Sequence, residues 1–392
     1  MEARTVTVVG AGPAGLMAAE AAVGAGARVA IVDQRRSFGR TLLLAGRSGL
    51  NLTHAESIDH FLDRYGAGRS LVEPAIRDFP PDAVRAWADG LGADTFVGSS
   101  GRVFPAAMRA TGLLRAWIAR LDEAGVTMQT GRPWTGFDDP IGDRGAVVLA
   151  LGGASWPSVG GDGSWAAAFA AVGVEVEPLV ASNAGALVDW SAPMLKRHEG
   201  HPIKNAAISV GGRTVRGEPT ITATGLEGGP IYALGPELRA ALAGGEASLA
   251  IDLQPDRSVE SLSARLTDAR RAKDSRSTWL RRAGFAPLAI DLLREGTANR
   301  LPDQPEALAR LAKAVPIRVH ALAPMDRAIS SAGGVAAAEI DSTGMLHRRP
   351  GWWVAGEMVA WDAPTGGYLL QACLSTGRRA GLAAARWAAD RP

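Results

Sequence analysis

Few side chains in this sequence could move a proton at neutral pH. The chain of 392 residues has six histidines, three tyrosines and a single cysteine, Cys373. One cysteine excludes an internal disulfide, a redox cysteine pair and a multi-cysteine metal site, so we expect no metal centre. As acid or base candidates we single out His54, His320 and Tyr368. An ordinary hydrogen-bonded role is the simpler interpretation of each histidine, and packing is the simpler interpretation of Tyr368.

A second group of residues has the spacing of a phosphate-binding turn. Gly10, Gly12 and Gly15 follow the β-branched run 5–9 and open an alanine-rich stretch, 14–25, that favours helix. Gly10 permits a tight turn, Gly12 lets the backbone approach a pyrophosphate, and Gly15 allows close packing of helix on strand. Free N–H groups at the helix start also favour phosphate. The pattern predicts a dinucleotide-binding βαβ unit.

An acidic residue completes this unit. Asp33 closes the apolar run 28–32, and its carboxylate can accept hydrogen bonds from ribose hydroxyls. It would repel a 2′-phosphate, so FAD or NAD is favoured over NADP. Arg40 and Arg47 flank a glycine-containing loop and could donate to phosphate or flavin, or could equally be solvated. The predicted contacts at this end of the chain are Gly10, Gly12, Pro13, Ala14, Gly15, Asp33, Gln34 and Arg40.

The far end of the chain favours FAD over NAD. Gly356 and Glu357 follow an apolar run, and Gly366 and Gly367 precede a helix that starts near Tyr368. A second helix N-terminus with bare glycines could meet another polar part of one extended ligand. Reduced flavin carries negative charge near its pyrimidine ring, which such a helix end would stabilise. Ordinary turn glycines are the alternative interpretation of this segment.

The elements around these motifs alternate as in an α/β fold. The runs expected as buried strands near the motifs are 5–9, 28–33, 146–151 and 351–361. The ranges expected as helices are 14–25, 81–91, 110–124, 164–172 and 369–390. From about residue 180 the pattern changes to short antiparallel strands, followed by a helical stretch. We expect a Rossmann-like domain made of 1–180 and 325–392, a β-rich insert made of 181–257 and 315–324, and a small helical insert, 258–314.

Six ordered segments of the sequence resemble one protein family. They are VVGAGPAGLMAA, GRTLLLAGRSGLNLTH, LALGGASWPSVGGDG, TGLEGGPIYALGPELR, SSAGGVAAAEID and WWVAGEMVAWDAPTGGYLLQA. This set is similar to that of the HI0933-like FAD-dependent oxidoreductases, which include aminoacetone oxidase-like and bile-acid-reductase-like flavoproteins. The resemblance implies a Rossmann-like FAD domain interrupted by a β-barrel-like and a small helical domain. It also implies that Asn51, Leu52, Gly152 and Gly153 contact the cofactor and that His54 lies in a loop beside the flavin.

The chain departs from the family at several of these positions. Leu50 stands where the family commonly has Cys, and His54 stands where it often has Asn. Leu151 replaces the usual Thr between Ala and Gly, and Leu369 follows the Gly-Gly-Tyr sequence where Asn is common. Because these positions lie near the implied flavin ring, the substrate class is not carried over from the family.

The function that these features predict is an FAD-dependent oxidoreductase. Hydride would pass between flavin N5 and a small or medium organic molecule, either to reduce an activated double bond or to oxidise an amine or alcohol. No second strand–Gly-x-Gly-x-x-Gly–helix unit is evident, so NADH or NADPH would dock transiently, or another donor would reduce the flavin. The alternatives are an FAD-dependent tRNA-modifying protein and a non-enzymatic flavin redox sensor.

Charge and hydropathy limit the partners. The net charge of +2 does not imply a polyanionic partner. The Arg-rich stretch 268–284 is interleaved with Asp268 and Asp274, so we expect a solvated helix face and no nucleic acid. No apolar signal core and no run of about 18 apolar residues is present, which predicts a cytoplasmic protein without a membrane span. Asn51 in its glycosylation-acceptor pattern is then a loop residue. The oligomeric state and the substrate stay open.

Overall fold

The computed structural model of the chain describes residues 5–46, 49–141 and 145–390. The chain forms two compact units. The first combines both chain ends, Met1–Ala181 and Ile329–Pro392, and the second is the intervening Ser182–Ala328. Arg47, a predicted phosphate or flavin contact, lies outside the described residues. The two units are described separately below.

A five-stranded parallel sheet forms the centre of the first unit. Its strand order is β18-β7-β1-β2-β6, and every neighbouring pair is parallel. The strands are β1 (Thr5–Val9), β2 (Arg28–Asp33), β6 (Thr127–Thr130), β7 (Ala146–Leu149) and β18 (Trp352–Val354). Val8 and Val148 are fully buried, as expected for a parallel sheet that is covered on both faces. Because the chain runs from β1 outward in both directions, ligands are expected at the carboxyl ends of β1 and β7.

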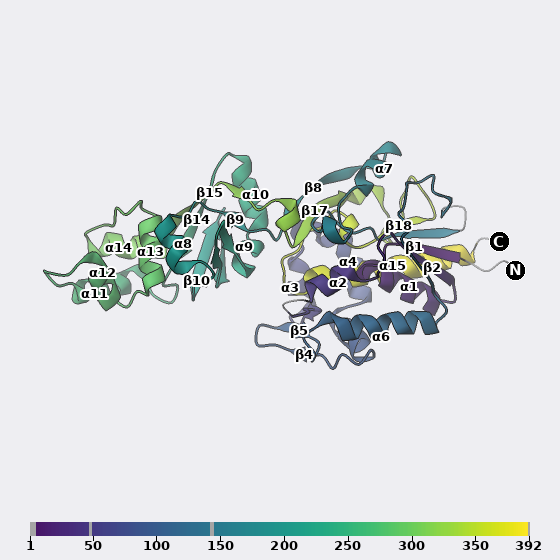
Figure 1. Ribbon diagram of the computed structural model, residues 1–392, viewed down its shortest axis with the longest axis horizontal. Helices are drawn as coiled ribbons and strands as arrows, with labels where there is room; N and C mark the ends of the chain where they lie inside the picture. The colour runs from purple at the N-terminus through teal and green to yellow at the C-terminus, as the bar shows by residue number, and fades with distance from the viewer. Residues whose placement is uncertain (1–4, 47–48, 142–144, 391–392) are drawn as a thin grey trace. The chain divides into compact units, whose positions relative to one another are not determined.

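Two helices pack tightly together against this sheet (Figure 1). They are α1 (Pro13–Gly24) and the C-terminal α15 (Tyr368–Ala389). A Cβ atom placed on Gly377 or Gly381 would come within 2.1 Å of a backbone oxygen of α1, that of Ala14 or Ala18. The bare glycines therefore let the two helices touch backbone to backbone. This contact joins a helix near the start of the chain to the helix at its end.

The other elements of the first unit surround this centre. The remaining helices are α2 (Arg40–Ala45), α3 (Ile58–Asp63), α4 (Arg69–Asp78), α5 (Pro81–Asp89), α6 (Ala110–Glu123) and α7 (Trp165–Ala171). A small antiparallel sheet has the order β3-β5-β4, with strands β3 (Thr53–His54), β5 (Arg102–Phe104) and β4 (Phe96–Val97). A further pair joins β8 (Val176–Ser182) to β17 (Ser330–Val335).

The second unit combines two four-stranded sheets with seven helices among the described residues. One sheet has the order β11-β10-β14-β15 and the other β12-β13-β9-β16. The strands are β9 (Ala186–Leu187), β10 (Ala206–Val210), β11 (Arg213–Gly217), β12 (Thr220–Thr222), β13 (Gly225–Glu227), β14 (Ala247–Asp252), β15 (Val315–Val319) and β16 (Ala321–Leu322). The helices are α8 (Ala192–His198), α9 (Gly229–Ala233), α10 (Gly235–Ala243), α11 (Val259–Ala269), α12 (Arg276–Arg282), α13 (Pro287–Glu295) and α14 (Pro305–Lys313).

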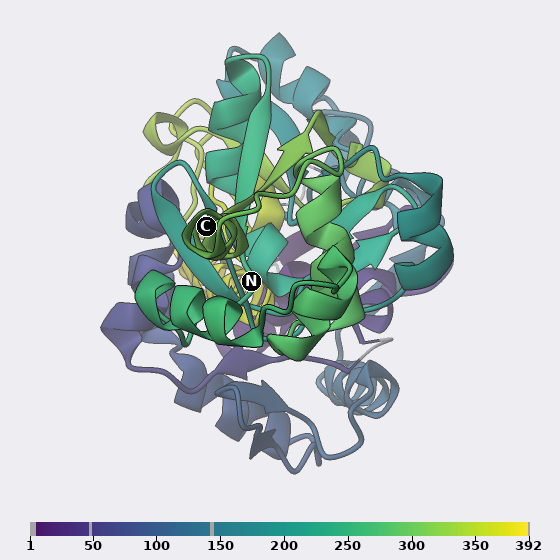
Figure 2. The same ribbon diagram turned by 90° about the vertical axis from the view of Figure 1, so that its left-hand side faces the viewer.

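The helices α11 to α14 and the sheets of the second unit share one hydrophobic core. Leu266 of α11 and Leu308 of α14 belong to the same buried cluster as Leu249 and Ile317 of the sheet. The four helices are drawn in shades of green in Figures 1 and 2 and are labelled in Figure 1. The predicted division of this region into a β-barrel-like part and a separate helical insert stays a prediction.

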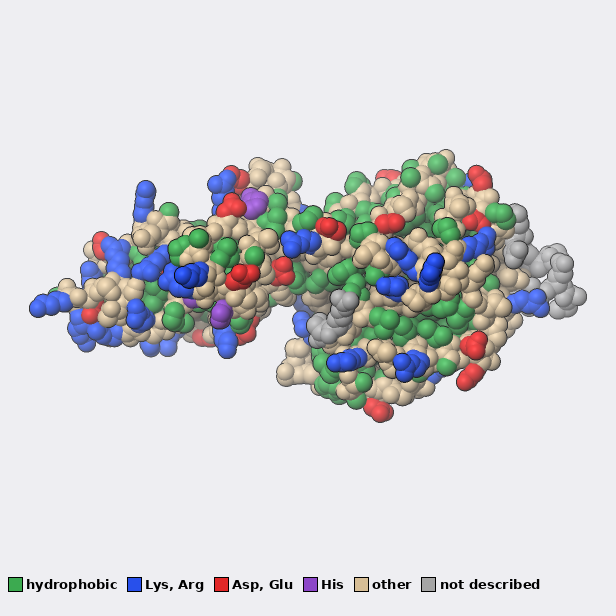
Figure 3. Space-filling view, in the orientation of Figure 1, with side chains coloured by type: hydrophobic (Ala, Val, Ile, Leu, Met, Phe, Trp, Pro, Cys, Tyr) green, Lys and Arg blue, Asp and Glu red, His purple; other side chains and the backbone are tan. Residues whose placement is uncertain are grey.

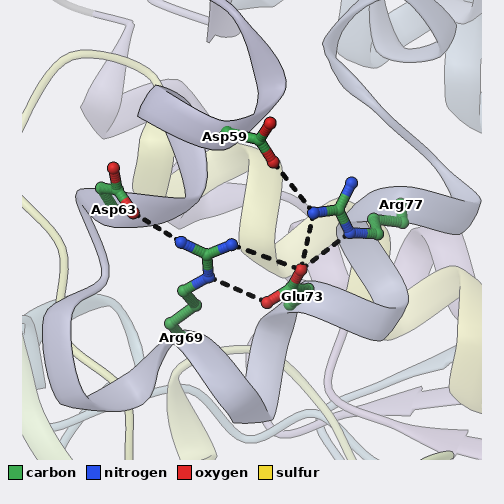
Figure 4. Close-up of polar contacts among 5 residues, drawn as sticks. All are labelled: Asp59, Asp63, Arg69, Glu73 and Arg77. Carbon is green, nitrogen blue, oxygen red and sulfur yellow. Dashed lines mark hydrogen bonds and ion pairs between the residues drawn. The ribbon is translucent and has the colours of Figure 1, made fainter.

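An ion-pair network joins α3 to α4 on the surface of the first unit (Figure 4). Glu73 receives hydrogen bonds from Arg69 and Arg77, each four residues away on α4. The two arginines also pair with Asp63 and Asp59 of α3. The bonds from Arg69 and Arg77 lower the pKa of Glu73 to about 2. Exposed pairs of this kind contribute little individually, so we interpret the network as orienting α3 on α4.

The Glu20 carboxylate links three helices of the first unit through hydrogen bonds. Glu20 of α1 accepts hydrogen bonds from the indole N–H groups of Trp87 (3.0 Å) and Trp117 (2.6 Å) and from Arg120 (3.0 Å).

Replacement of Glu20 by alanine would leave the N–H of the fully buried Trp117 without an acceptor. We expect a loss of about 3 kcal/mol in the free energy of unfolding, measured by urea denaturation. Glu123→Ala, at the exposed end of α6, is the control and should cost less than about 0.5 kcal/mol; equal effects would contradict the assignment.

Candidate functional site

A cavity opens in the first unit at the carboxyl ends of β1, β2 and β7. Its wall contains most of the predicted cofactor contacts, namely Gly10, Gly12, Pro13, Ala14, Asp33, Gln34, Arg40, Gly152, Gly153, Gly356 and Glu357. Residues that sequence reasoning did not select also line it, among them Arg35, Arg132, Trp134, Trp156, Asp162 and Cys373. The motifs from both chain ends therefore meet at one cavity.

The three glycines of the turn after β1 have three different surroundings. A Cβ on Gly10, whose φ is +99°, would lie 2.3 Å from the carbonyl oxygen of Ala150 at the end of β7. A Cβ on Gly15 would lie 1.8 Å from the carbonyl oxygen of Gly10. Gly12 differs, because its Cβ would meet only the Thr41 hydroxyl, at 3.6 Å, and would otherwise point into free space. The sheet needs Gly10 and Gly15, whereas Gly12 leaves room that a ligand can use.

Asp33 lies at the end of β2 in the cavity wall. One carboxylate oxygen accepts the backbone N–H of Ala11 and the other accepts that of Arg35, both at 2.7 Å. These bonds fix the carboxylate against the turn after β1. Each oxygen retains a further lone pair, so the predicted bonds to ribose hydroxyls stay possible.

The segment 156–161 forms another part of the wall. The Gln34 amide donates to the carbonyl of Gly160 (3.2 Å) and the Arg35 guanidinium donates to the carbonyl of Pro157 (2.7 Å). The Trp156 indole N–H donates to the carbonyl of Ile329 (2.9 Å). Gln34 and Arg35, which directly follow Asp33, therefore hold the segment 156–161 in place across the cavity.

The turn after β18 closes the cavity on the side of α15. A short 3-10 turn spans Gly356–Met358, and its first residue has a φ of +74°. The Gly356 N–H donates to the Thr376 hydroxyl (3.0 Å), and its carbonyl accepts the indole N–H of Trp361 (2.9 Å). The sequence predicted a strand over the whole of 351–361, but it ends at Val354 because this turn reverses the chain.

The carboxyl group of Glu357 is unusual. Burial, together with the nearby charge of Asp362, raises its pKa to about 7, although the Ser331 N–H bond opposes the shift. The Cys373 thiol is buried beside it, and burial followed by the Glu357 charge raises the pKa of Cys373 as well. Both groups line the cavity in a neutral form at slightly acid pH.

The remaining predicted contacts of the first unit gather at the start of α15 and do not line this cavity. A Cβ on Gly367 would lie 2.5 Å from the carbonyl carbon of Thr53, so β3 packs directly on the helix start. The Thr53 hydroxyl donates to the Gln371 side chain (2.7 Å). The Oδ1 atom of Asn51 is buried and has no hydrogen-bond partner. The residues placed here are Asn51, Leu52, His54, Gly366, Gly367 and Tyr368.

Tyr368 and His54 are held in fixed hydrogen bonds at this position. The Tyr368 hydroxyl donates to Glu56 (2.6 Å), which also accepts two bonds from Arg64. Burial, and then the Glu56 carboxylate, raises the pKa of Tyr368, so the phenol stays protonated. The His54 ring stacks on Tyr368 at 5.6 Å, its Nδ1 accepts the Glu56 N–H (3.2 Å) and its Nε2 lies 3.0 Å from the Ser100 carbonyl. Sequence reasoning missed Glu56, which joins both candidates.

The third acid–base candidate lies elsewhere in the chain. His320 belongs to the second unit, next to β15 and β16. Its Nδ1 lies 3.6 Å from a carboxylate oxygen of Asp189. Its catalytic role stays a prediction, as do those of His54 and Tyr368.

Comparison with known proteins identifies the family. The model of the HI0933-like protein Rossmann domain matches residues 4–383. The chain belongs to the HI0933-like family. This membership confirms the family that the six segments predicted, and with it the Rossmann-type FAD-binding fold and the class of FAD-dependent oxidoreductases.

The individual relatives share only a minor part of their sequence with this chain. The chain is 26% identical over 426 aligned positions to the 3-dehydro-bile acid delta(4,6)-reductase of Clostridium scindens, with 97% of this chain and 98% of the relative covered. A flavocytochrome c3 fumarate reductase is 17% identical, with 98% and 79% of the chains covered and a TM-score of 0.49. The 3-ketosteroid-delta4-(5alpha)-dehydrogenase of Rhodococcus jostii RHA1 is 16% identical, with 97% and 96% covered and a TM-score of 0.48. At these TM-scores neither structure assigns a substrate to this chain.

The residues of the cavity fit an FAD molecule. Gly12 leaves space at the N-terminus of α1, where free N–H groups favour a pyrophosphate. Asp33 keeps acceptor capacity for ribose hydroxyls in the same cavity wall. Among the described residues, no helix is both long and apolar enough to cross a bilayer.

Proposed function

We propose that this protein reduces a carbon–carbon double bond conjugated to a ketone in a flat, apolar organic molecule. The observation that carries the proposal is the cavity at the ends of β1, β2 and β7, where both chain ends supply a glycine turn suited to FAD. The family supplies the oxidoreductase class. The choice of reduction over the oxidation of an amine or alcohol is supported by the relative named as a bile acid delta(4,6)-reductase.

The chain's own residues would bind and orient the cofactor. The backbone at Gly12 and the start of α1 would hold the pyrophosphate, whose negative charges Arg35 and Arg40 of the wall would complement, whereas Arg132 is already paired with Asp139. Asp33 would hold the ribose. Bound FAD supplies the hydride chemistry, and the protein supplies position and local charge.

Reduction of the double bond also needs a proton. One hydride would reach the β-carbon and one proton the α-carbon, so the products balance. We propose Tyr368 as the proton source in preference to His54, because its O–H is protonated at neutral pH and its partner is a carboxylate, which can take up and return a proton, whereas the partners of His54 are backbone groups. Glu56 would orient the Tyr368 hydroxyl. NADH or NADPH, docking transiently, is the electron donor that we propose for the flavin.

Anaerobic mixing tests this proposal. Holoenzyme with reduced FAD is mixed with a 3-oxo-Δ4 steroid, and the flavin band near about 450 nm is followed. We expect reoxidation of the flavin with one saturated ketone formed per FAD, no reaction with the 4,5-saturated ketone, and about 100-fold slower reoxidation in Tyr368→Phe. Flavin that stays reduced with every enone, while amines or alcohols reduce the oxidised enzyme, would contradict the proposed direction.

The nucleic-acid alternative receives no support from the Arg-rich stretch. Figure 3 shows basic side chains over the part of the second unit that carries α11 and α12. Most of these arginines already have partners within the unit. Arg276 pairs with Asp303, Arg282 pairs with Asp274, and Arg271 donates to the Asp268 carbonyl. We therefore interpret this stretch as a solvated, internally paired helical surface.

A further inference from the structure

An arginine beside Tyr368 has no partner within the described part of the chain. Arg102 belongs to β5 and stands opposite His54 of β3 in the register of the small sheet. The residue is half-buried, and its side chain makes no ion pair and no hydrogen bond with any described residue. By contrast, Arg64 of the same cluster forms two hydrogen bonds with Glu56. The charge of Arg102 is therefore available to a ligand.

One glycine places Arg102 next to the Tyr368 ring. A Cβ atom on Gly366 would lie 2.9 Å from Cε2 of Tyr368 and 3.9 Å from Nε of Arg102. The phenol ring and the guanidinium therefore flank the same bare backbone position. Gly101, the residue before Arg102, packs on His54, because a Cβ there would lie 2.5 Å from the imidazole Cε1 atom. The strand that carries Arg102 thus lies against both proton-transfer candidates of the first unit.

The charges of this cluster do not balance. Glu56 is the carboxylate that accepts the Tyr368 hydroxyl, and Arg64 already compensates its charge at 2.7 Å. Arg102 adds a second guanidinium to the cluster without a carboxylate of its own. A fixed cation near a proton donor can stabilise negative charge that develops during a reaction. The cluster can therefore hold one anionic atom of a substrate.

We propose that Arg102 holds the ketone oxygen of the enone and stabilises the enolate that forms during its reduction. The inference rests on the proposed function and adds a residue that touches the substrate. Hydride from the reduced flavin would reach the β-carbon, and the electron pair of the double bond would move toward the oxygen. Arg102 would donate N–H bonds to that oxygen and keep its own proton. Tyr368 would then protonate the α-carbon, which restores the ketone, and solvent would return a proton to Tyr368.

The chemistry of an enone requires these two groups to be neighbours. Its oxygen and its α-carbon are both bonded to the carbonyl carbon. The group that holds the oxygen must therefore lie close to the group that protonates the α-carbon. Arg102 and Tyr368 meet this requirement, because both lie within 4 Å of the Cβ position of Gly366. The planar guanidinium also offers several N–H donors to one oxygen.

A solvated side chain is the competing explanation for Arg102. A half-buried arginine whose guanidinium faces water needs no acceptor from the protein or from a ligand. In that case its removal would change neither the binding of a substrate mimic nor the rate of reduction.

Binding of a polycyclic phenol separates the two explanations. The phenol oxygen mimics the enolate oxygen, and the same ring system without the hydroxyl serves as the reference compound. Holoenzyme with oxidised FAD is titrated with each, and the change in the flavin absorption band gives the dissociation constant. We expect Arg102→Met to weaken binding of the phenol by roughly 10- to 100-fold and to leave binding of the reference compound unchanged. At a pH at which the free phenol is neutral, its ultraviolet spectrum should show the ionised form on the wild type and the neutral form on Arg102→Met.

Two further variants complete the test. Arg109→Met removes the same charge from an exposed position just before α6 and should bind both compounds as the wild type does. Arg102→Lys keeps the charge but not the planar donors, so its affinity for the phenol should be intermediate. Reduced holoenzyme should be reoxidised by a 3-oxo-Δ4 steroid about 100-fold more slowly in Arg102→Met than in the wild type.

The outcomes distinguish this inference from the proposed function. Equal phenol affinity in the wild type and Arg102→Met would overturn the inference, and so would an equal loss in Arg109→Met. Either result would leave the proposed function intact if the wild type still reduces the enone. A wild-type holoenzyme that no enone reoxidises would instead overturn the proposed function itself.

Discussion

Replacement of Gly12 by valine should abolish FAD binding and leave the protein folded. Gly12 has ordinary extended backbone angles, and a Cβ there would meet only the Thr41 hydroxyl at 3.6 Å. The valine side chain would therefore occupy space where the pyrophosphate approaches the helix N-terminus. Loss of two or more charge-assisted hydrogen bonds predicts an affinity at least roughly 100-fold weaker. Equilibrium dialysis with FAD measures the affinity, and circular dichroism checks the fold.

Gly15→Val is the matched comparison for this prediction. It is the same substitution three residues further along the motif, but its Cβ would lie 1.8 Å from the Gly10 carbonyl oxygen. We expect this variant to be unfolded or insoluble, because backbone atoms of a turn and a helix cannot both move away. A Gly12→Val protein that binds FAD normally, or that fails to fold as Gly15→Val does, would show that the turn does not hold the cofactor.

Replacement of Glu357 by glutamine should change how stability depends on pH. The folded-state pKa of Glu357 is about 7, above its usual value of 4.5. Because the folded-state pKa is raised, the contribution of this carboxyl to the free energy of unfolding is complete below pH 4.5. It is lost as the pH rises through about 7. We expect this loss to be about 3 kcal/mol, because a tenfold change in an equilibrium constant corresponds to about 1.4 kcal/mol. Between pH 4.5 and 8 the apo wild type should lose that much stability relative to Glu357→Gln.

Comparing the unfolding free energies of wild type and Glu357→Gln at each pH isolates the contribution of this carboxyl, because the other titrating groups are present in both proteins. Asp362→Asn serves as the second variant. The Asp362 charge helps to raise the pKa of Glu357, so its removal should move the loss of stability to lower pH. Parallel pH profiles for wild type and Glu357→Gln would mean that Glu357 titrates like an exposed carboxyl.

The part of the site that could be predicted from sequence is the part set by local spacing. The glycines at 10, 12 and 15 and Asp33 belong to one βαβ unit, whose geometry fixes where each lies. The turns at 152–153 and 356–357 follow strands that became neighbours in one parallel sheet, so their meeting at one edge follows from the strand assignments. Parallel strands present their carboxyl ends at the same edge.

Contacts between segments far apart in the sequence could not be predicted in this way. The Tyr368–Glu56 bond joins positions separated by 312 residues, and no spacing rule connects them. The sequence predicted Gly366 and Gly367 as cofactor contacts, but it could not show that Gly367 packs on Thr53 and places the helix start against β3. Trp134 lies in an irregular segment without a motif, so only the structure places it in the cavity wall.

The FAD content of the purified protein tests the central claim most directly. The wild-type chain, reconstituted with FAD and freed of excess cofactor, should carry one FAD per chain, as measured by absorbance after denaturation against the protein concentration. Gly12→Val, treated in parallel, should carry almost none. A colourless wild-type protein that retains no FAD, or equal retention by both proteins, would contradict the assignment of this cavity as the flavin site.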